Sequence, residues 1–177
     1  MEHQKINIFE IPLIKLILKD LDTSHWISLL YQLKKENPGG VSKSNGGGYQ
    51  SEDDLHLNQL FFPLIEIINS SINKIFKDPN LKIMGMWGNI SSFSNFNWPH
   101  SHSSDKLTQM ISGVLYLQVP KNSGDIVFCS PYDVNIQVFK HTPIEKEIIL
   151  FPANTQHLVY PNESNEDRLS IAFNISL

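Results

Sequence analysis

The chain has 177 residues, of which 41% are apolar and 18% charged, and its formal net charge is −4. These values are those of an ordinary globular protein, and the mild negative charge disfavours nucleic acid as a partner, since that needs a basic surface. The single cysteine, Cys129, excludes an internal disulfide and fits a cytoplasmic, reducing compartment. From the chain length we expect a single domain, residues 1–177. The apolar runs are too short to cross a membrane, so we expect no membrane-spanning segment.

Residues 1–80 contain one strand-like run and two helix-like segments. Residues 5–18 are rich in isoleucine and leucine, and Pro12 within them predicts an edge strand, because proline has no N–H for a central ladder. A helix is expected from residue 22 or 23 to residue 36, where apolar residues recur at helical spacing. A second apolar stripe predicts a helix from residue 57 or 63 to residue 77. We assign both helices to packing.

The segment 41–54 between these helices is rich in glycine and serine and contains Gly46-Gly47-Gly48. It lacks the Gly-Lys-Ser/Thr ending of a phosphate-binding loop, which argues against a nucleotide site of that kind. Two interpretations stay open for it. It is either a flexible connector, or a functional loop or lid that lies near a binding site.

Residues 81–177 have a different texture, with short apolar or alternating runs between glycine, proline, asparagine and aspartate. This pattern is typical of an all-β sandwich or barrel, which the two helices would support. Cys129 lies in one of these runs, and we expect it to be a small buried hydrophobe. The expected strands are residues 81–90, 107–119, 125–129, 134–139, 147–151, 157–160 and 168–175.

Two histidines one residue apart, His100 and His102, give the sharpest chemical signal. On an extended chain both point to the same side, so two imidazoles can bind one metal ion. His157, close to a later strand-like run, is the natural third ligand. The alternative is a solvated strand face, because a histidine pair alone is weak evidence for metal. We expect His141 at the surface.

The last strand-like run alternates between two faces, with Arg168 and Ser170 on one and Leu169 and Ile171 on the other. An arginine fork beside a serine hydroxyl suits a carboxylate, which arginine binds through two parallel hydrogen bonds. The alternative is an exposed salt bridge between Arg168 and a neighbouring acidic residue, Glu166 or Asp167.

Six motifs follow one another along the chain, at residues 44–51, 100–102, 112–117, 123–128, 150–159 and 168–174. In this order they resemble a 2-oxoglutarate/Fe(II)-dependent oxygenase family, first grouped as uncharacterised proteins of this size. The implied fold is mainly β with N-terminal helices, a prolyl-hydroxylase-like double-stranded β-helix (jelly roll) with a cupin-like barrel. The implied activity is that of a dioxygenase that uses Fe(II) and O2 to oxidise 2-oxoglutarate to succinate and carbon dioxide and to hydroxylate a substrate.

The resemblance implies three side chains that hold iron, and here the chain departs from the usual pattern. That pattern is His-x-Asp/Glu followed by a distal histidine, but His102 occupies the acidic position. Either His100, His102 and His157 bind Fe(II), or Asp105 joins His102 and His157 while His100 lies outside the ligand set. The spacing of a regular strand favours three histidines, because residues 102 and 105 do not share a face.

The resemblance also implies a site for the cosubstrate. Arg168 fits the basic residue that binds the far carboxylate of 2-oxoglutarate, with Ser170 beside it. Tyr116 either donates its hydroxyl to the same cosubstrate or is a core aromatic with its hydroxyl at the rim. Asn89 shares a face with Trp87 on an expected strand, and we expect it to point into the site.

Two other functions stay open. A cupin-like three-histidine metalloprotein that does not use 2-oxoglutarate is suggested by residues 152–157, although the glutamate expected after His-x-His is absent. A metal-free β-sandwich binding module is the third reading. Trp87, Trp98 and Phe93 either line a pocket or belong to an aromatic core, and the core is favoured. The sequence names no substrate, whether peptide or small molecule, and it is compatible with a homodimer.

Overall fold

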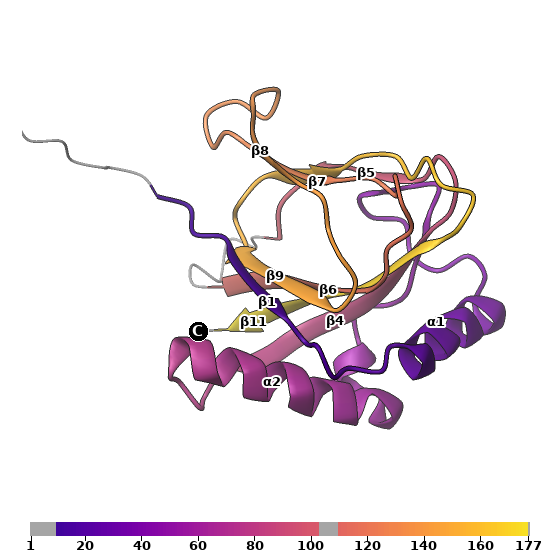
Figure 1. Cartoon of the computed structure of the whole chain (residues 1–177), viewed down its shortest axis with the longest axis vertical. Helices are drawn as coiled ribbons and strands as arrows, with labels where there is room; N and C mark the ends of the chain where they lie inside the picture. The colour runs from indigo at the N-terminus through magenta and orange to yellow at the C-terminus, as the bar shows by residue number, and fades with distance from the viewer. Residues whose placement is uncertain (1–9, 103–109, 177) are drawn as a thin grey trace, which may run out of the picture.

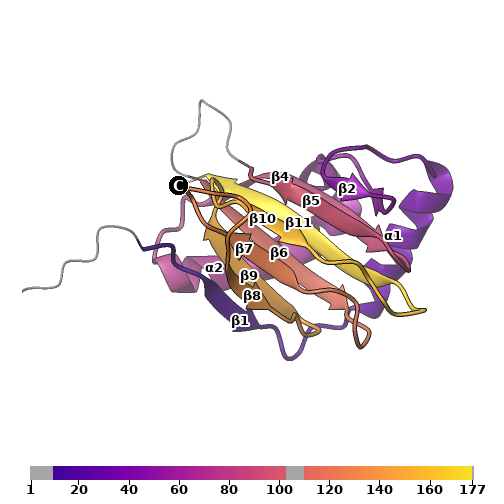
Figure 2. The same cartoon turned by 90° about the horizontal axis from the view of Figure 1, so that it is seen from above.

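The computed structural model describes residues 10–102 and 110–176, and in it two β-sheets face each other as two layers. Both helices lie beneath the larger sheet, on the side away from the smaller sheet (Figure 1). Seen from above, the smaller sheet lies in front of the larger one (Figure 2). The N-terminal helices and the β-sandwich are arranged as the sequence predicts.

The larger sheet has six strands, and every pair in it is antiparallel. The N-terminal strand, with Pro12 just before it, lies at an edge as predicted. In sheet order the strands are β1 (Ile14–Ile17), β9 (Glu147–Pro152), β6 (Met110–Gln118), β11 (Arg168–Ser176), β4 (Lys82–Ser91) and β3 (Tyr49–Gln50). The strand β11 lies inside this sheet and pairs along almost its whole length with β4 on one side and β6 on the other.

The smaller sheet has five shorter antiparallel strands. In sheet order they are β2 (Asn45–Gly46), β5 (Phe96–His100), β10 (His157–Val159), β7 (Ile126–Cys129) and β8 (Gln137–His141). The sequence analysis missed β2, β3 and β5, and it placed β8 three residues too early at its start. These strands are short and contain many polar residues and glycine, so they lack the alternating apolar pattern from which a strand is predicted.

The helices α1 (Ser24–Glu36) and α2 (Phe62–Phe76) bury their apolar stripes against the outer face of the larger sheet. Two short 3₁₀ turns, Leu55–Leu57 and Gln59–Phe61, precede α2. Because side chains alternate along β11, its large apolar residues turn to this outer face, and its polar residues and Ala172 lie on the inner one. The core that results includes Leu30, Leu64, Ile68, Leu169, Ile171 and Phe173, all with no exposed surface.

The inner space between the sheets has its own apolar cluster, formed by Tyr116, Ile126, Phe128, Ile149 and Phe151. It fills one part of the sandwich and leaves the other part open. Beside it, Cys129 is a free, buried cysteine, which confirms the predicted small hydrophobe.

His141 is not the surface residue that the sequence analysis expects. Its Nε2 lies 2.7 Å from Oε2 of Glu147, and both side chains are almost fully buried. Glu147 is the first residue of β9 and points between the sheets, so this carboxylate has a partner that a sequence pattern does not reveal. Among the described residues, neither helix is long and apolar enough to cross a membrane.

Candidate active site

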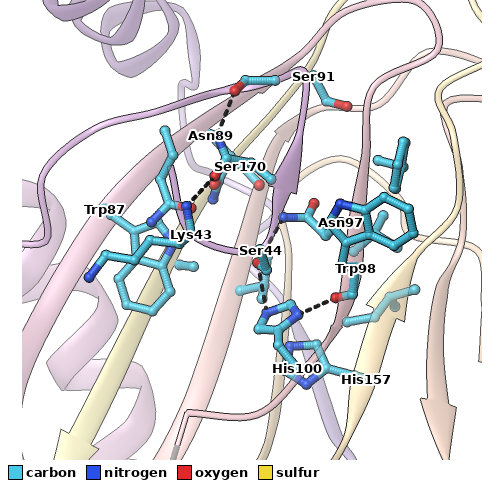
Figure 3. Close-up of a pocket in the computed structure, with 18 of the residues that line it drawn as sticks. Lys43, Ser44, Trp87, Asn89, Ser91, Asn97, Trp98, His100, His157 and Ser170 are labelled. Atoms are coloured by element: carbon cyan, nitrogen blue, oxygen red, sulfur yellow. Dashed lines mark hydrogen bonds between the residues drawn. The ribbon is translucent and has the colours of Figure 1, made fainter. Parts of the chain in front are cut away.

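A cavity of about 540 Å³ lies between the two sheets at the end where β2 and β3 join them. It is lined by residues of β4, β6 and β11 on one side and of β5 and β10 on the other. Histidines gather on the side of the smaller sheet, and an arginine lies on the side of the larger one. Figure 3 shows the side chains that line this cavity.

The three predicted histidines come together in the cavity. His157 on β10 is paired directly opposite His100 on β5, and His102 follows two residues after His100. One ring nitrogen from each of the three side chains lies within 4.8 Å of the others. Long-range strand pairing therefore assembles the cluster. His100 and His102 lie on the same side of the chain, as their spacing predicts.

A β-bulge shapes the strand that carries His100. On β10, His157 pairs with His100 and Val159 pairs with Asn97, so the register shifts between these two pairs. The shift places Asn97 and His100 on the inner face although they are three residues apart. Trp98 is 59% exposed and Phe93 is also exposed, so the expectation that these two aromatics belong to the core is wrong.

Backbone carbonyls fix the orientation of two of the imidazoles. Nδ1 of His100 lies 2.7 Å from the carbonyl oxygen of Trp98, and Nδ1 of His157 lies 2.9 Å from that of Thr155. A carbonyl oxygen can only accept, so in both rings Nδ1 carries the proton and Nε2 is the unprotonated nitrogen, which can accept a hydrogen bond or bind a metal. Metal-binding histidines typically donate their second ring N–H in this way.

His102 completes the cluster. Its backbone N–H donates to the carbonyl of Ala153 at 2.7 Å, and its ring stacks on Trp87 and on His157, with centroid distances of 5.2 and 5.1 Å. Nε2 of His102 lies 3.3 Å from Nε2 of His157. Because Nε2 of His157 is the unprotonated nitrogen of its ring, Nε2 of His102 donates in this contact, and both nitrogens lie where they could share an ion once that proton is lost.

Burial lowers the pKa of each of these three histidines, and neighbouring imidazoles lower it further for His102 and His157. The pKa of His102 falls to about 4, and that of His157 falls well below its usual value. The rings are therefore neutral at pH 7, and neutral imidazole is the form that binds a metal.

At the other side of the cavity, Arg168 begins β11 and is only 5% exposed. Its Nη1 donates to the carbonyl oxygens of Ser123 and Gly124, at 2.6 and 3.0 Å. Neither of the two ion pairs between described residues includes Arg168. The carboxylate of Asp167 instead accepts a hydrogen bond from Tyr31 at 2.9 Å, so the alternative of a salt bridge to a sequence neighbour is not observed.

A row of polar side chains crosses the larger sheet next to Arg168. Ser170 on β11 is paired with Asn89 on β4 and with Tyr116 on β6, so the three side chains share the inner face. All three line the cavity, as Asn89 and Ser170 in Figure 3 illustrate. Burial raises the pKa of Tyr116, so its hydroxyl keeps its proton and can donate it in a hydrogen bond.

The sequence analysis gave Ser44 and Asn97 no role, yet both reach the histidine cluster. Oγ of Ser44 lies 3.3 Å from Nε2 of His100, and Nδ2 of Asn97 donates to the same hydroxyl at 3.2 Å. The glycine-rich segment supplies Ser44, and its position follows from the pairing of β2 with β5. Asp105, the alternative ligand, lies outside the described residues.

Comparisons with known proteins agree with this fold. Residues 132–174 match the model of a family described as "Putative 2OG-Fe(II) oxygenase", whereas no curated protein matches the sequence. A prolyl-4-hydroxylase from Pseudomonas putida superposes with a TM-score of 0.65, at 15% identity over 93% of this chain and 91% of that one.

Two further solved structures superpose over the same share of this chain. The non-haem α-ketoglutarate-dependent carbocyclase SnoK of nogalamycin biosynthesis has a TM-score of 0.73 at 10% identity over 93% of this chain and 79% of its own. HygX from Streptomyces hygroscopicus, solved with nickel and 2-oxoglutarate, has a TM-score of 0.68 at 11% identity over 93% and 82%. These identities are low, so the superpositions speak for the fold and confirm the jelly roll.

The matched segment 132–174 contains the distal histidine His157 and the pair Arg168 and Ser170, on which the sequence resemblance also depends. The family match covers this C-terminal segment and does not reach His100 or His102. The resemblance found in the sequence is confirmed: the chain has the fold of the 2-oxoglutarate/Fe(II) oxygenases, and its C-terminal part matches one of their families.

Proposed function

We propose that this protein is an Fe(II)- and 2-oxoglutarate-dependent dioxygenase that hydroxylates its substrate. One observation carries the proposal: the same cavity has three converging neutral imidazoles on one side and a buried arginine without a carboxylate partner among the described residues on the other. A molecule with a chelating end and a distant carboxylate would satisfy both sides. 2-Oxoglutarate has these two ends.

His100, His102 and His157 would hold the iron, because their ring nitrogens converge and backbone carbonyls orient two of the rings. The bound iron would supply the activation of O2 that oxidises 2-oxoglutarate to succinate and carbon dioxide. A set of three neutral ligands leaves the metal more positive than a set with one carboxylate, and this favours binding of an anionic chelating group. Asp105 remains the alternative third ligand, in place of His100.

Arg168 would bind the far carboxylate of 2-oxoglutarate. The two carbonyls occupy only Nη1 of this buried guanidinium, so a ligand carboxylate would accept from its other N–H groups and offset part of the cost of burying the charge. Ser170, Tyr116 and Asn89 would contribute hydroxyl and amide hydrogen bonds from the same face. Because these residues belong to long, fully paired strands, they would orient the cosubstrate toward the histidines with little reorganisation.

A thermal-shift experiment tests the proposal with Mn(II), which does not turn over, in place of iron. We expect 2-oxoglutarate to raise the melting temperature only when Mn(II) is present. Glutarate has both carboxylates but lacks the keto oxygen, so it should stabilise the protein much less. Equal stabilisation by the two acids with and without metal would contradict chelation. Formation of succinate that requires Fe(II) then tests catalysis.

A second function deserves the same experiment, because no described carboxylate belongs to the histidine cluster. A three-histidine metalloprotein that does not use 2-oxoglutarate would be stabilised by Mn(II) and would not respond to 2-oxoglutarate. The cytoplasmic location and the homodimer stay predictions, and gel filtration with light scattering checks the second.

A further inference from the structure

The glycine-rich segment is neither a loose connector nor a phosphate loop. Its strand β2 pairs with β5 in the smaller sheet, and its strand β3 pairs with β4 in the larger sheet. The segment therefore joins the two layers at the end of the cavity that holds the histidines. Gly46 lies under the ring of Phe96, where an added Cβ would be 2.6 Å from Cζ, and Gly47 has a φ of +81° that favours glycine.

Hydrogen bonds within the segment hold its position. The side chain of Asn45 donates to the carbonyls of Val41 and Gly48, at 3.1 and 2.7 Å, and accepts from the backbone N–H of Lys43 at 2.8 Å. The carbonyl of Ser44 accepts from the backbone N–H of Trp98 at 2.8 Å. These hydrogen bonds fix the backbone at Ser44 and thereby the direction of its side chain. Figure 3 shows this side chain pointing toward His100.

The hydroxyl of Ser44 contacts Nε2 of His100, the ring nitrogen that would bind a metal. Because Nδ1 of His100 donates to the carbonyl of Trp98, Nε2 is the nitrogen that accepts, and Ser44 donates to it at 3.3 Å. The same hydroxyl oxygen accepts from Asn97 at 3.2 Å, which leaves its proton free to point at His100. One lone pair cannot serve both the hydroxyl proton and a metal ion.

We propose that Ser44 is a positioning residue whose hydroxyl competes with a metal ion for Nε2 of His100, so that metal binding and the position of the glycine-rich segment 41–54 are thermodynamically coupled. In the metal-free protein the Ser44 hydroxyl holds the His100 ring in place. When Nε2 of His100 binds a metal, this hydrogen bond would be lost, and the Ser44 hydroxyl, still held by Asn97, would be able to donate its proton to a ligand in the cavity. This inference rests on the proposed metal site.

The test is the affinity of the full chain for Mn(II), measured by calorimetry for the wild type and three variants. Ser44→Ala removes the competing donor and should tighten binding about two- to fivefold, the equivalent of one weak neutral hydrogen bond. Ser44→Thr keeps the hydroxyl and should restore the wild-type affinity. Ser42→Ala, an exposed serine on the same segment, is the matched control and should bind like the wild type.

A second readout uses the metal-free protein. We expect the ¹⁵N resonance of Nε2 of His100 to move toward the value of an unbonded imidazole nitrogen in Ser44→Ala, and to stay in place in Ser42→Ala. An unchanged resonance would overturn the inference, as would an unchanged or weaker affinity of Ser44→Ala when the wild type binds Mn(II) tightly. A wild type that binds no divalent metal overturns the proposed function together with this coupling.

Discussion

The two sheets contribute to the cavity in different ways. The arginine side lies on β4, β6 and β11, three long strands whose paired residues place Asn89, Ser170 and Tyr116 in one row. The histidine side lies on β5 and β10, which are short and carry a bulge, and His102 follows the end of β5. Under the proposed function, the larger sheet would be a preorganised support for an anion, whereas a bound ion would replace the contact between Nε2 of His100 and Ser44 on the other side.

The layers behind the two sheets differ as well. The larger sheet is covered on its outer face by both helices, which form the main core with it. On the smaller sheet, β8 lies at an edge with exposed apolar residues such as Val138 and Phe139. Stability therefore comes mostly from the side of the molecule that carries the arginine, and changes on the histidine side should affect binding more than folding.

The largest expected effect is the loss of metal binding in His157→Ala. Removing this ligand leaves two, and we expect the affinity for Mn(II) to fall roughly 100-fold or more, since loss of supporting contacts alone costs 10- to 100-fold. The matched control is His25→Ala, which alters an exposed histidine on α1. Calorimetry on both variants checks this, and retained tight binding in His157→Ala would remove this histidine from the site.

The contrast between the supporting layers predicts a difference in stability. Phe173 is fully buried between β11 and the helices, so Phe173→Ala should lower the free energy of unfolding by about 3–5 kcal/mol. Phe139→Ala on β8 removes an exposed ring and should cost less than about 1 kcal/mol. Urea unfolding measures both. Equal losses would contradict the assignment of the main core to the helix side.

Arg168→Met separates the two sides of the cavity. It should weaken binding of 2-oxoglutarate to the Mn(II) protein by about 2–4 kcal/mol, roughly 30- to 1,000-fold, because a buried charge-assisted contact is lost. The affinity for Mn(II) itself should not change. Lys140→Met is the control, since this lysine is exposed and pairs with Asp125 at 3.2 Å. A loss of metal binding with unchanged 2-oxoglutarate affinity would reverse the assignment.

The smallest effects concern the neutral row beside Arg168. Tyr116→Phe and Ser170→Ala each remove one hydroxyl from the inner face, and each should weaken 2-oxoglutarate binding by about 1 kcal/mol, roughly fivefold. Titration of the Mn(II) protein checks this. Should neither variant differ from the wild type, the row would only line the cavity.

The sequence predicted the parts that depend on local periodicity. Alternation in β11 assigned Arg168 and Ser170 to one face, and the helices followed from their apolar spacing. His157 was named as the third ligand from its place near a strand-like run, and the family resemblance agreed with that choice. That it lies directly opposite His100 follows from strand pairing, which periodicity does not predict. The position of Ser44 and the bulge that turns Asn97 inward depend on pairing between distant strands, and neither leaves a pattern in the local sequence.

Buried pairs were also beyond the reach of the sequence. His141 and Glu147 contact each other because β8 and β9 bring them together, and a histidine near a turn gives no sign of this. The same holds for the tautomers of His100 and His157, which are set by carbonyls two residues away on a particular backbone path.

The most direct test of the central claim is an anaerobic titration of the protein with Fe(II) and 2-oxoglutarate. Chelation of iron by the keto acid gives a weak visible charge-transfer band. We predict that this band appears in the wild type and is lost in His157→Ala. If Fe(II) binds but no band develops on addition of 2-oxoglutarate, the cosubstrate assignment is contradicted, and the three histidines serve a metal that works without it.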